Sequence, residues 1–369
     1  MNPFIISSYK GPDFFCDREK ETGQLVDAIA NDRNMVITSL RRMGKTGLIR
    51  HVFNELNKGR EYYLFYIDID HTDSLNDFVN KLANSLLRIP KRSFYERALD
   101  FLKQFRPVIT FNPVTNQPEV DFRHDGARQD EVNIESLFAY IDKLNRKVII
   151  AVDEFQRITS YENERVEAFL RTHIQHLNNV RFIFSGSSRQ LLQAMFSDHS
   201  RPFYQSAGFM ELGRLDKSAY TDFVDHHFSI TGREINKNDI GSCIDWSDNH
   251  TFYMQYLFNM IWGSGIKKVS DDDINEVMEE ILQSRDALYT NYRKLLTSNQ
   301  FQLLKAIALE KVVEHPNSMD FIRSHSLGSI STVSSALKVL IDKELIYHEN
   351  GQYKLYDVFQ SQWFRHRGQ

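Results

Sequence analysis

The sequence predicts an α/β fold in which helices cover both faces of a parallel sheet, followed by a helical segment and a winged helix. Three observations carry this prediction. Short β-branched and aromatic runs alternate with helical patterns as far as residue 212. Only helical patterns follow, from residue 216 to residue 283. Residues 299–369 then show three helical patterns and a hairpin, which is the order of elements in a winged helix.

Five segments are predicted as strands because their apolar residues run on without polar alternation: 35–38, 62–69, 147–153, 180–185 and 209–212. Such runs are typical of parallel strands, which are covered on both faces. Helical patterns lie between them, at 47–57, 75–87, 134–144 and 163–177. This alternation indicates an α/β layer fold with right-handed crossovers.

We predict three parts in the chain: a core at 1–213, a helical segment at 214–298 and a winged helix at 299–369. Inside the core, residues 108–111 and 119–122 flank a stretch with two prolines and two asparagines, which predicts an inserted hairpin at about 105–125. It is interpreted as a decorative insertion, with a lip over a site or a docking edge as the alternative. In the winged helix, Asn350-Gly351 is a strong hairpin-turn signal and predicts the wing.

The composition is that of an ordinary globular protein. The 369 residues are 41% hydrophobic and 25% charged, and the formal net charge of −4 argues against a general polyanion binder. No apolar run approaches the roughly 18 residues of a membrane span, and no secretory signal is visible. Two cysteines, Cys16 and Cys243, form no disulfide framework or zinc motif. A reduced, cytoplasmic setting without membrane contact is therefore predicted.

The sharpest motif is S-L-R-R-M-G-K-T at residues 39–46. It lies between a predicted strand and an amphipathic helix, as the phosphate-loop pattern GxxxxGK[ST] requires, although Ser39 replaces the first glycine. Backbone N–H groups in such a loop form an anion cradle at the helix N-terminus. We expect Lys45 to reach the β- and γ-phosphates of ATP or ADP, and Thr46 to offer its hydroxyl to Mg²⁺. The residues expected around the nucleotide here are Ser39, Leu40, Arg41, Arg42, Met43, Gly44, Lys45, Thr46 and Gly47.

Because backbone amides fill this cradle, the side chains of Arg41 and Arg42 are expected to face solvent or a partner.

A second motif follows the strand at 147–153, where Asp153 and Glu154 stand at its carboxyl end. Ligands bind at that edge of open α/β sheets. Asp153 is expected to hold Mg²⁺ and Glu154 to polarise the attacking water. A helix N-cap is the alternative reading of this pair.

A third motif, F-S-G-S-S-R at residues 184–189, ends the fourth predicted strand. Small hydroxyl residues there can bond the γ-phosphate or the attacking water, and Ser185 is favoured because it ends the strand. A Ser/Gly-rich turn that begins a helix is an equally weighted alternative.

Several segments together resemble prokaryotic AAA+ ATPases of the STAND group, often described as archaeal-type ATPases. They are F-F-C-D-R-E-K-E at 14–21, the loop at 39–46 with its two arginines, V-D-E-F-Q at 152–156, F-S-G-S-S at 184–188, H-T-F-Y-M-Q at 250–255 and Y-D-V-F-Q-S-Q-W-F-R at 356–365. The resemblance implies a P-loop NTPase core, a helical lid, a winged helix and an ATP-dependent switch. It also places Phe15 at the nucleotide.

The chain departs from the family pattern in three places. Ser39 replaces a glycine, and Thr251 replaces the proline of the lid segment. Where the family often has an arginine, residues 204–206 have none, so only Arg201 could serve as an arginine finger. Ring-type hydrolysis is therefore not predicted.

The winged helix has little positive charge for a DNA reader. Residues 301–369 contain 8 Lys or Arg and 7 Asp or Glu, a balance of +1. A protein-contacting or autoinhibitory role is preferred, with DNA as the alternative. Phe359 and Trp363 share a helix face, which either closes the winged-helix core or docks, with Arg365, against the ATPase core.

Two functions are carried forward. The first is a slowly hydrolysing ATP-dependent switch that acts on a protein partner or through self-association. The second is a DNA-associated ATPase resembling the replication-initiator branch of AAA+ proteins. A nucleotide-binding scaffold without hydrolysis is a weaker third, because Glu154 argues against it.

Overall fold

The protein folds into two compact units in the computed structural model, which describes residues 1–369 except 60, 90, 112–117, 123–125, 164 and 368–369. One unit is Gly11–Gly213, here called the core unit. The other combines Met1–Lys10 with Arg214–Gln369 and is here called the second unit. The ten N-terminal residues thus belong with the C-terminal half of the chain.

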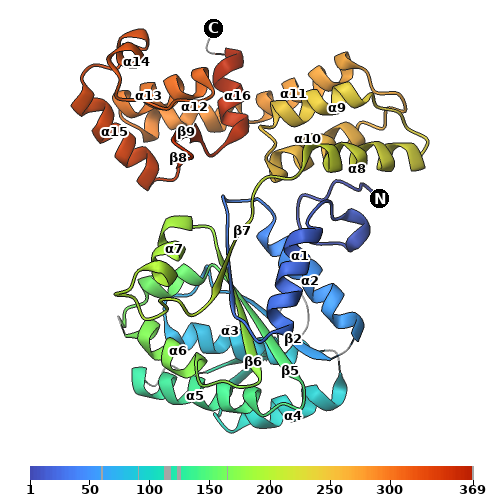
Figure 1. The fold of residues 1–369 in the computed structure, drawn as a ribbon, viewed down its shortest axis with the longest axis vertical. Coiled ribbons are helices and arrows are strands. Elements are labelled where there is room, and N and C mark those ends of the chain that lie inside the picture. Colours follow the sequence, from blue (N-terminus) through green and yellow to red (C-terminus); the bar gives the residue numbers. More distant parts are fainter. Residues whose placement is uncertain (60, 90, 112–117, 123–125, 164, 368–369) are drawn as a thin grey trace. The chain divides into compact units, whose positions relative to one another are not determined.

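The core unit contains a five-stranded sheet in the order β2-β5-β6-β1-β7, and every pair is parallel (Figure 1). The strands are β1 (Met35–Thr38), β2 (Tyr62–Asp68), β5 (Lys147–Asp153), β6 (Val180–Gly186) and β7 (Gly208–Glu211). Each predicted strand is present to within one residue at either end, and the parallel α/β class is confirmed. Buried apolar residues on both faces explain the continuous runs.

Helices cover both faces of this sheet (Figure 1). On one face, α1 (Glu19–Ala30) and α2 (Lys45–Gly59) bury Leu25, Leu48 and Val52 against it. On the other lie α3 (Leu75–Leu87), α4 (Arg92–Lys103), α5 (Ala127–Asp142), α6 (Val166–Ile174) and α7 (Arg189–Ser197). Neither α1 nor α4 was predicted from the sequence. The carboxyl ends of the strands carry the predicted chemical motifs, so this layering fixes where those side chains meet.

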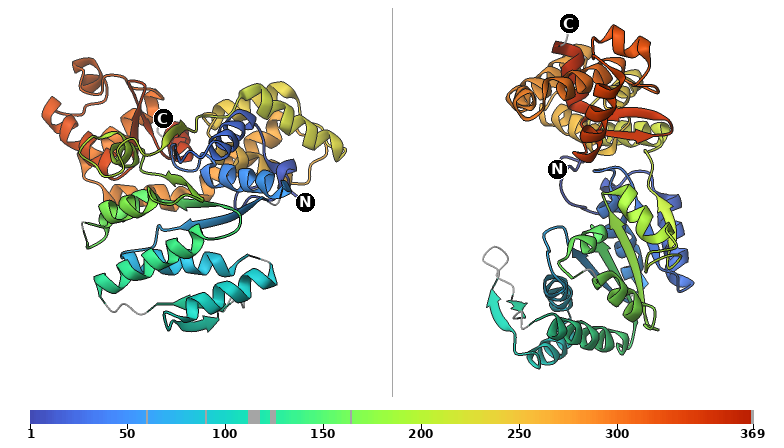
Figure 2. Two further views of the ribbon diagram at one scale, coloured as in Figure 1. Left: turned by 60° about the horizontal axis from the view of Figure 1, so that its bottom comes forward. Right: turned by 90° about the vertical axis from the view of Figure 1, so that its left-hand side faces the viewer.

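The predicted insertion contains an antiparallel hairpin of β3 (Val108–Phe111) and β4 (Pro118–Asp121), visible in Figure 2 beside α4 and α5. Its predicted turn lies mostly outside the described residues. Two asparagines of α3 hold β4: Asn84 accepts from Val120 N at 2.8 Å, and Asn80 accepts from Phe122 N at 2.8 Å. The hairpin is therefore fixed to α3 by hydrogen bonds from both side chains.

The second unit is helical apart from the wing. Its elements are α8 (Lys217–Ile230), α9 (Lys237–Trp246), α10 (Thr251–Gly263), α11 (Asp271–Ser284), α12 (Asp286–Leu295), α13 (Ser298–Glu310), α14 (Met319–Ser324), α15 (Ile330–Asp342), β8 (Ile346–Glu349), β9 (Gln352–Leu355) and α16 (Val358–Arg367). The predicted helices and hairpin of the winged helix are all present. The turn at Asn350-Gly351 has positive φ at both residues, 51° and 80°, as a tight hairpin requires.

The helical segment and the winged helix share a packed interface. The ring of Phe359, on α16, lies 4.7 Å from that of Tyr253 and 5.4 Å from that of Trp246. The guanidinium of Arg285 lies 4.9 Å from the Tyr256 ring and 5.0 Å from the Phe359 ring. Phe359 is fully buried there, so it packs on the helical segment.

Trp363 and Arg365, which were expected to dock with Phe359 on the ATPase core, also make contacts in this part of the second unit. Trp363 donates through Nε1 to Asp286 at 2.9 Å, and Arg365 donates through Nε to the carbonyl of Ala308 at 2.7 Å. Both partners lie in the second unit. All three side chains thus make contacts within their own unit, and the docking of this face on the ATPase core stays a prediction.

The N-terminal segment is anchored in the second unit by Phe4. This side chain is fully buried among aromatic rings of α8 and α10: Phe223, His227, Phe228, Phe258 and Trp262. Asn259 donates to the carbonyl of Phe4 at 2.6 Å, and Asn2 donates to the carbonyl of Asn259 at 2.9 Å. Apolar burial and reciprocal hydrogen bonds both hold the segment in place.

Candidate functional site

The loop between β1 and α2 buries its apolar side chains and exposes its two arginines. Leu40 and Met43 are 8% and 2% exposed, whereas Arg41 and Arg42 face outward as expected. Arg42 has φ 61° and Gly44 has φ 98°, so the chain takes left-handed turns before α2 begins. Successive turns of this kind direct backbone N–H groups toward one concavity, which suits an anion.

Lys45 is the first residue of α2 and is 7% exposed. Its Nζ donates to Ser39 Oγ at 3.0 Å and to the carbonyl of Leu40 at 3.4 Å, both neutral oxygens. Burial lowers the pKa of Lys45, while Asp153 and Glu154 act in the opposite direction. A buried ammonium held by neutral acceptors at the start of a helix fits a phosphate group. Ser39 therefore supplies an oxygen to Lys45 that glycine could not.

Asp153 is the centre of a hydrogen-bonded cluster at the end of β5, and it is 4% exposed. Its Oδ2 accepts from Thr46 Oγ1 at 2.7 Å and from the Tyr66 hydroxyl at 2.8 Å. Its Oδ1 accepts from Ser185 Oγ at 2.6 Å and from Glu154 N at 3.1 Å. The two residues predicted as Mg²⁺ ligands, Thr46 and Asp153, thus meet. A carboxylate and a hydroxyl are oxygen donors that Mg²⁺ accepts.

Ser185 lies near the end of β6 and contacts Asp153. Its side chain is fully buried in β6, and its hydroxyl donates to Asp153. This geometry makes it a residue that positions Asp153, and a direct catalytic role for Ser185 stays a prediction.

Glu154 follows Asp153 with a left-handed backbone, φ 56°. Its Oε2 accepts from Ser187 N at 3.0 Å, Ser187 Oγ at 2.8 Å and Gln156 Nε2 at 2.5 Å. A Cβ added to Gly186 would lie 1.9 Å from Gln156 Oε1, so glycine leaves room for this arrangement. Ser187 and Gln156 were not predicted as partners of Glu154, although they lie inside the motifs at 184–189 and 152–156.

Phe15 lies against the start of α2. A Cβ added to Gly47 would be 3.5 Å from the Phe15 ring, which stacks on His51 at 4.4 Å between centroids. Nearby in sequence, Arg18 is 5% exposed and donates to the carbonyl of Gly213 at 2.7 Å. Phe15 thus lies against α2, the helix that follows the phosphate loop. Its contact with a nucleotide stays a prediction.

Arg201, the residue considered as an arginine finger, is engaged inside the core unit. Its guanidinium donates through Nε to Glu167 at 3.2 Å and also pairs through Nη2 with the same carboxylate, which is 10% exposed. Burial raises the pKa of Glu167, and Arg201 opposes that shift. Freeing Arg201 would leave a largely buried carboxylate unpaired, which is costly.

Comparison with known proteins identifies the family of this chain. Residues 15–257 match a family described as an ATPase domain predominantly from Archaea. The chain belongs to this family of ATPases. Residues 287–366 match a probable winged helix domain. The P-loop ATPase core and the C-terminal winged helix that the sequence predicted are therefore confirmed.

Solved structures of similar fold extend over the whole chain. A Walker-type ATPase of Pyrococcus abyssi has a TM-score of 0.67 at 18% identity, covering 98% of this chain and 99% of its own. The ORC2 protein of Aeropyrum pernix, with ADPNP and ADP, has a TM-score of 0.60 at 14% identity, covering 99% and 96%. At these identities the likeness shows the fold of the ATPase.

One curated relative is described as an uncharacterised ATP-binding protein of Methanocaldococcus jannaschii. It is 28% identical over an alignment of 167 residues, and the match covers 39% of this chain and 43% of that protein. The match thus spans less than half the length of either. Among the described residues, no helix is long and apolar enough to cross a membrane.

Proposed function

We propose that this ATPase binds ATP with Mg²⁺ at the loop of residues 39–46 and hydrolyses it slowly as a molecular switch. The observation that carries the proposal is the convergence of Lys45, Thr46 and Asp153 at one end of the sheet, with Thr46 Oγ1 2.7 Å from Asp153. ATP binding is also what the family description implies.

Each side chain then has a distinct task. Lys45 places its ammonium on the β- and γ-phosphates, and the backbone amides of the loop bind the remaining oxygens. Thr46 and Asp153 would hold Mg²⁺, which neutralises charge on the phosphates. Glu154 orients the attacking water. In this structure Glu154 accepts three hydrogen bonds from Ser187 and Gln156, so low turnover is the expected consequence of this restraint.

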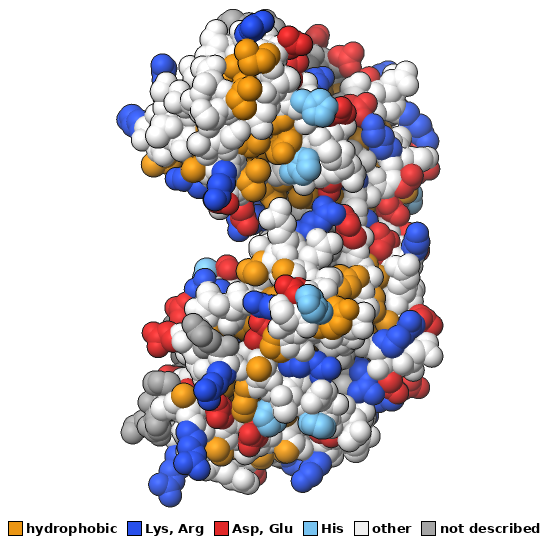
Figure 3. Space-filling model, turned by 60° about the vertical axis from the view of Figure 1, so that its left-hand side comes forward, with side chains coloured by type: hydrophobic (Ala, Val, Ile, Leu, Met, Phe, Trp, Pro, Cys, Tyr) orange, Lys and Arg blue, Asp and Glu red, His pale blue; other side chains and the backbone are white. Residues whose placement is uncertain are grey.

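The switch itself is proposed to act through the second unit. Helical segment and winged helix pack around Phe359 and Arg285, so a change at the nucleotide would be passed to both together. Their partner is proposed to be a protein, because the winged helix has a charge balance of only +1. Acidic and basic side chains are interspersed on the face shown in Figure 3. Nucleic-acid binding faces are instead enriched in positive charge.

A DNA-associated ATPase is the second possibility, and one observation favours it. The ORC1 protein of Aeropyrum pernix, solved in complex with DNA, has a TM-score of 0.52 over 97% of this chain at 13% identity. Exposed serines on α15 and around it could approach phosphates. If DNA is the partner, duplex DNA will change ATP turnover, and its binding will weaken steeply as salt is raised.

The test measures ATP binding by calorimetry and ATP turnover in the full chain, with and without duplex DNA. The proposal predicts Mg²⁺-dependent ATP binding, slow turnover and no response to DNA. Absence of ATP binding in parent protein would overturn the nucleotide site. Salt-sensitive stimulation by DNA would replace the protein-partner proposal with the DNA-associated one.

A further inference from the structure

Tyr66 is a side chain of the core unit that the proposed function does not use. It lies on the edge strand β2, in register with Ala151 of β5, and packs on the face of the sheet that α2 covers. Side chains two residues apart on a strand point to the same face, so Asp153 projects to this face as well. Tyr66 therefore lies on the same side of the sheet as the carboxylate that is expected to hold Mg²⁺.

The hydroxyl of Tyr66 holds one oxygen of that carboxylate. It donates to Asp153 Oδ2 at 2.8 Å, and Thr46 Oγ1 donates to the same oxygen at 2.7 Å. Ser185 Oγ and Glu154 N donate to Oδ1 at 2.6 and 3.1 Å. A carboxylate has about four acceptor positions, so these donors fill it. Because Thr46 is itself a predicted Mg²⁺ ligand, Tyr66 is the donor to Oδ2 that has no other assigned task.

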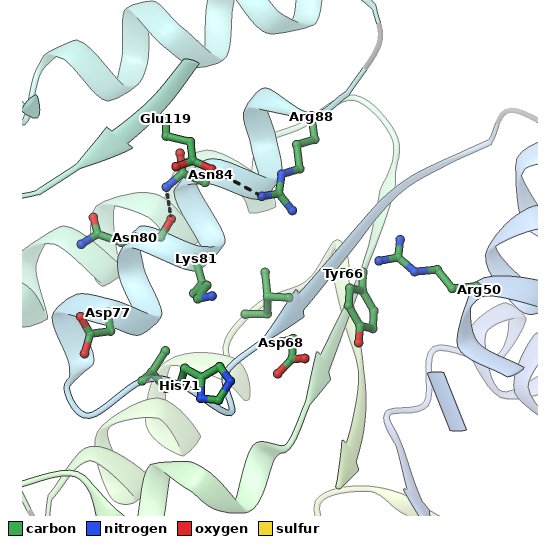
Figure 4. Close-up of a pocket in the computed structure, with 12 residues that line it drawn as sticks. Arg50, Tyr66, Asp68, His71, Asp77, Asn80, Lys81, Asn84, Arg88 and Glu119 are labelled. Atoms are coloured by element: carbon green, nitrogen blue, oxygen red, sulfur yellow. Dashed lines mark hydrogen bonds and ion pairs between the residues drawn. The ribbon is translucent and has the colours of Figure 1, made fainter. Parts of the chain in front are cut away.

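The ring of Tyr66 is in turn held from α2. The guanidinium carbon of Arg50 lies 3.9 Å from the ring centroid, and both side chains line the pocket drawn in Figure 4. The Arg50 side chain extends from its helix toward the ring (Figure 4). A cation over an aromatic face is attracted by the negative charge of that face. Arg50 therefore restricts the ring to an orientation that directs the hydroxyl to Asp153.

A side chain at this position that served packing alone would not need the hydroxyl. Phenylalanine fills nearly the same volume, and a hydroxyl in a half-buried place is costly unless it finds a partner. The partner of Tyr66 is a charged group, which makes the hydrogen bond stronger than one between neutral groups. Such bonds fix the orientation of metal-binding carboxylates, and their loss typically costs roughly 10–100-fold in metal affinity. The contact thus points to an effect on Mg²⁺.

We propose that Tyr66 is a positioning residue for the Mg²⁺ site: its hydroxyl orients the carboxylate of Asp153, and Arg50 holds its ring in place. The proposal rests on the proposed Mg²⁺-dependent binding of ATP at residues 39–46. In this role Tyr66 acts through Asp153 and contacts neither the nucleotide nor the metal. It determines how much Mg²⁺ the protein needs in order to bind ATP tightly.

The experiment measures the ATP affinity of the full chain by calorimetry, first in EDTA and then at rising Mg²⁺ concentration. Tyr66→Phe keeps the ring under Arg50 and loses only the hydroxyl. We expect this variant to need about tenfold more Mg²⁺ than the parent for the same gain in ATP affinity. Its ATP affinity in EDTA should equal that of the parent, because Lys45 and the loop amides are unchanged.

Tyr63→Phe is the matched control. It removes a hydroxyl from the same strand that donates to Asn145 at 3.3 Å, and it should leave the Mg²⁺ response unchanged. Arg50→Lys keeps the positive charge but loses the planar guanidinium over the ring, so it should raise the Mg²⁺ requirement about threefold. Combined with Tyr66→Phe it should add nothing further, because Arg50 acts through the hydroxyl of Tyr66.

An unchanged Mg²⁺ response in Tyr66→Phe would overturn the positioning role. So would an equal loss of ATP affinity in EDTA, since that would be a general effect on the loop, or an equal shift in Tyr63→Phe. An additive effect of Arg50→Lys in the double variant would overturn the part assigned to Arg50. Failure of the nucleotide proposal shows separately, as absent or Mg²⁺-independent ATP binding in the parent, and it would overturn both proposals.

Discussion

Ser185→Ala distinguishes a positioning role from direct contact with ATP. The substitution removes a fully buried hydroxyl that donates to Asp153 Oδ1 at 2.6 Å. A hydrogen bond to a charged group contributes about 1.5–3 kcal/mol. Because Glu154 N still reaches the same oxygen, we expect a loss near the lower figure, about tenfold in nucleotide affinity. The gap left by one oxygen atom is small, so the fold should be retained.

The assay measures ADP and ATP affinity at several Mg²⁺ concentrations. If Ser185 positions Asp153, both nucleotides weaken together, and high Mg²⁺ restores much of the loss. If Ser185 contacts the γ-phosphate, only ATP weakens and Mg²⁺ does not rescue it. Ser206→Ala, which loses a hydroxyl bonded to the carbonyl of Phe203, is the control and should bind as the parent does. An ATP-only defect would refute the positioning role.

Three further outcomes are expected. Lys45→Ala should weaken ATP at least tenfold by calorimetry, about 1.4 kcal/mol, since the buried ammonium is lost; unchanged affinity would remove the loop from the phosphate site. Glu154→Gln should keep ATP binding but lower turnover roughly 10²-fold in a phosphate-release assay; equal rates would eliminate Glu154 as the base. Phe4→Ala should lower the free energy of unfolding of the second unit by about 3–5 kcal/mol in denaturant titrations. Phe14→Ala, in the core unit and outside the aromatic cluster around Phe4, is the comparison. A change below 1 kcal/mol would mean that Phe4 contributes little.

The strands and the phosphate loop were predictable because their signals are local. A continuous apolar run places β5, and Asp153 necessarily stands at its end. The partners of Asp153 and Glu154 were harder to foresee. Tyr66 and Ser187 reach them from segments 87 and 33 residues away, through the side-by-side register of β2, β5 and β6. Only the sheet order brings these residues together.

The same limitation applies to the side chains whose roles the sequence left open. Phe359 and Trp363 do share a helix face, but which surface that face meets depends on how α16 packs. Arg201 has the right residue type for a finger, and only the fold reveals that Glu167 pairs with it. Spacing within one element thus predicts a shared face, whereas the identity of the opposing surface needs the tertiary structure.

The burial of Phe4 has a consequence for how the chain assembles during synthesis. Phe4 is made before the rings that enclose it, which begin at Phe223 and end at Trp262. At roughly 5–20 residues per second, the first of these rings leaves the ribosome about 10–40 s later. The core unit can fold in that interval, before the aromatic rings that bury Phe4 have been synthesised. Folding of the second unit then joins residues more than two hundred positions apart. Less conformational entropy is lost on closing this loop than with an unfolded intervening chain, because the core unit within the loop is already folded.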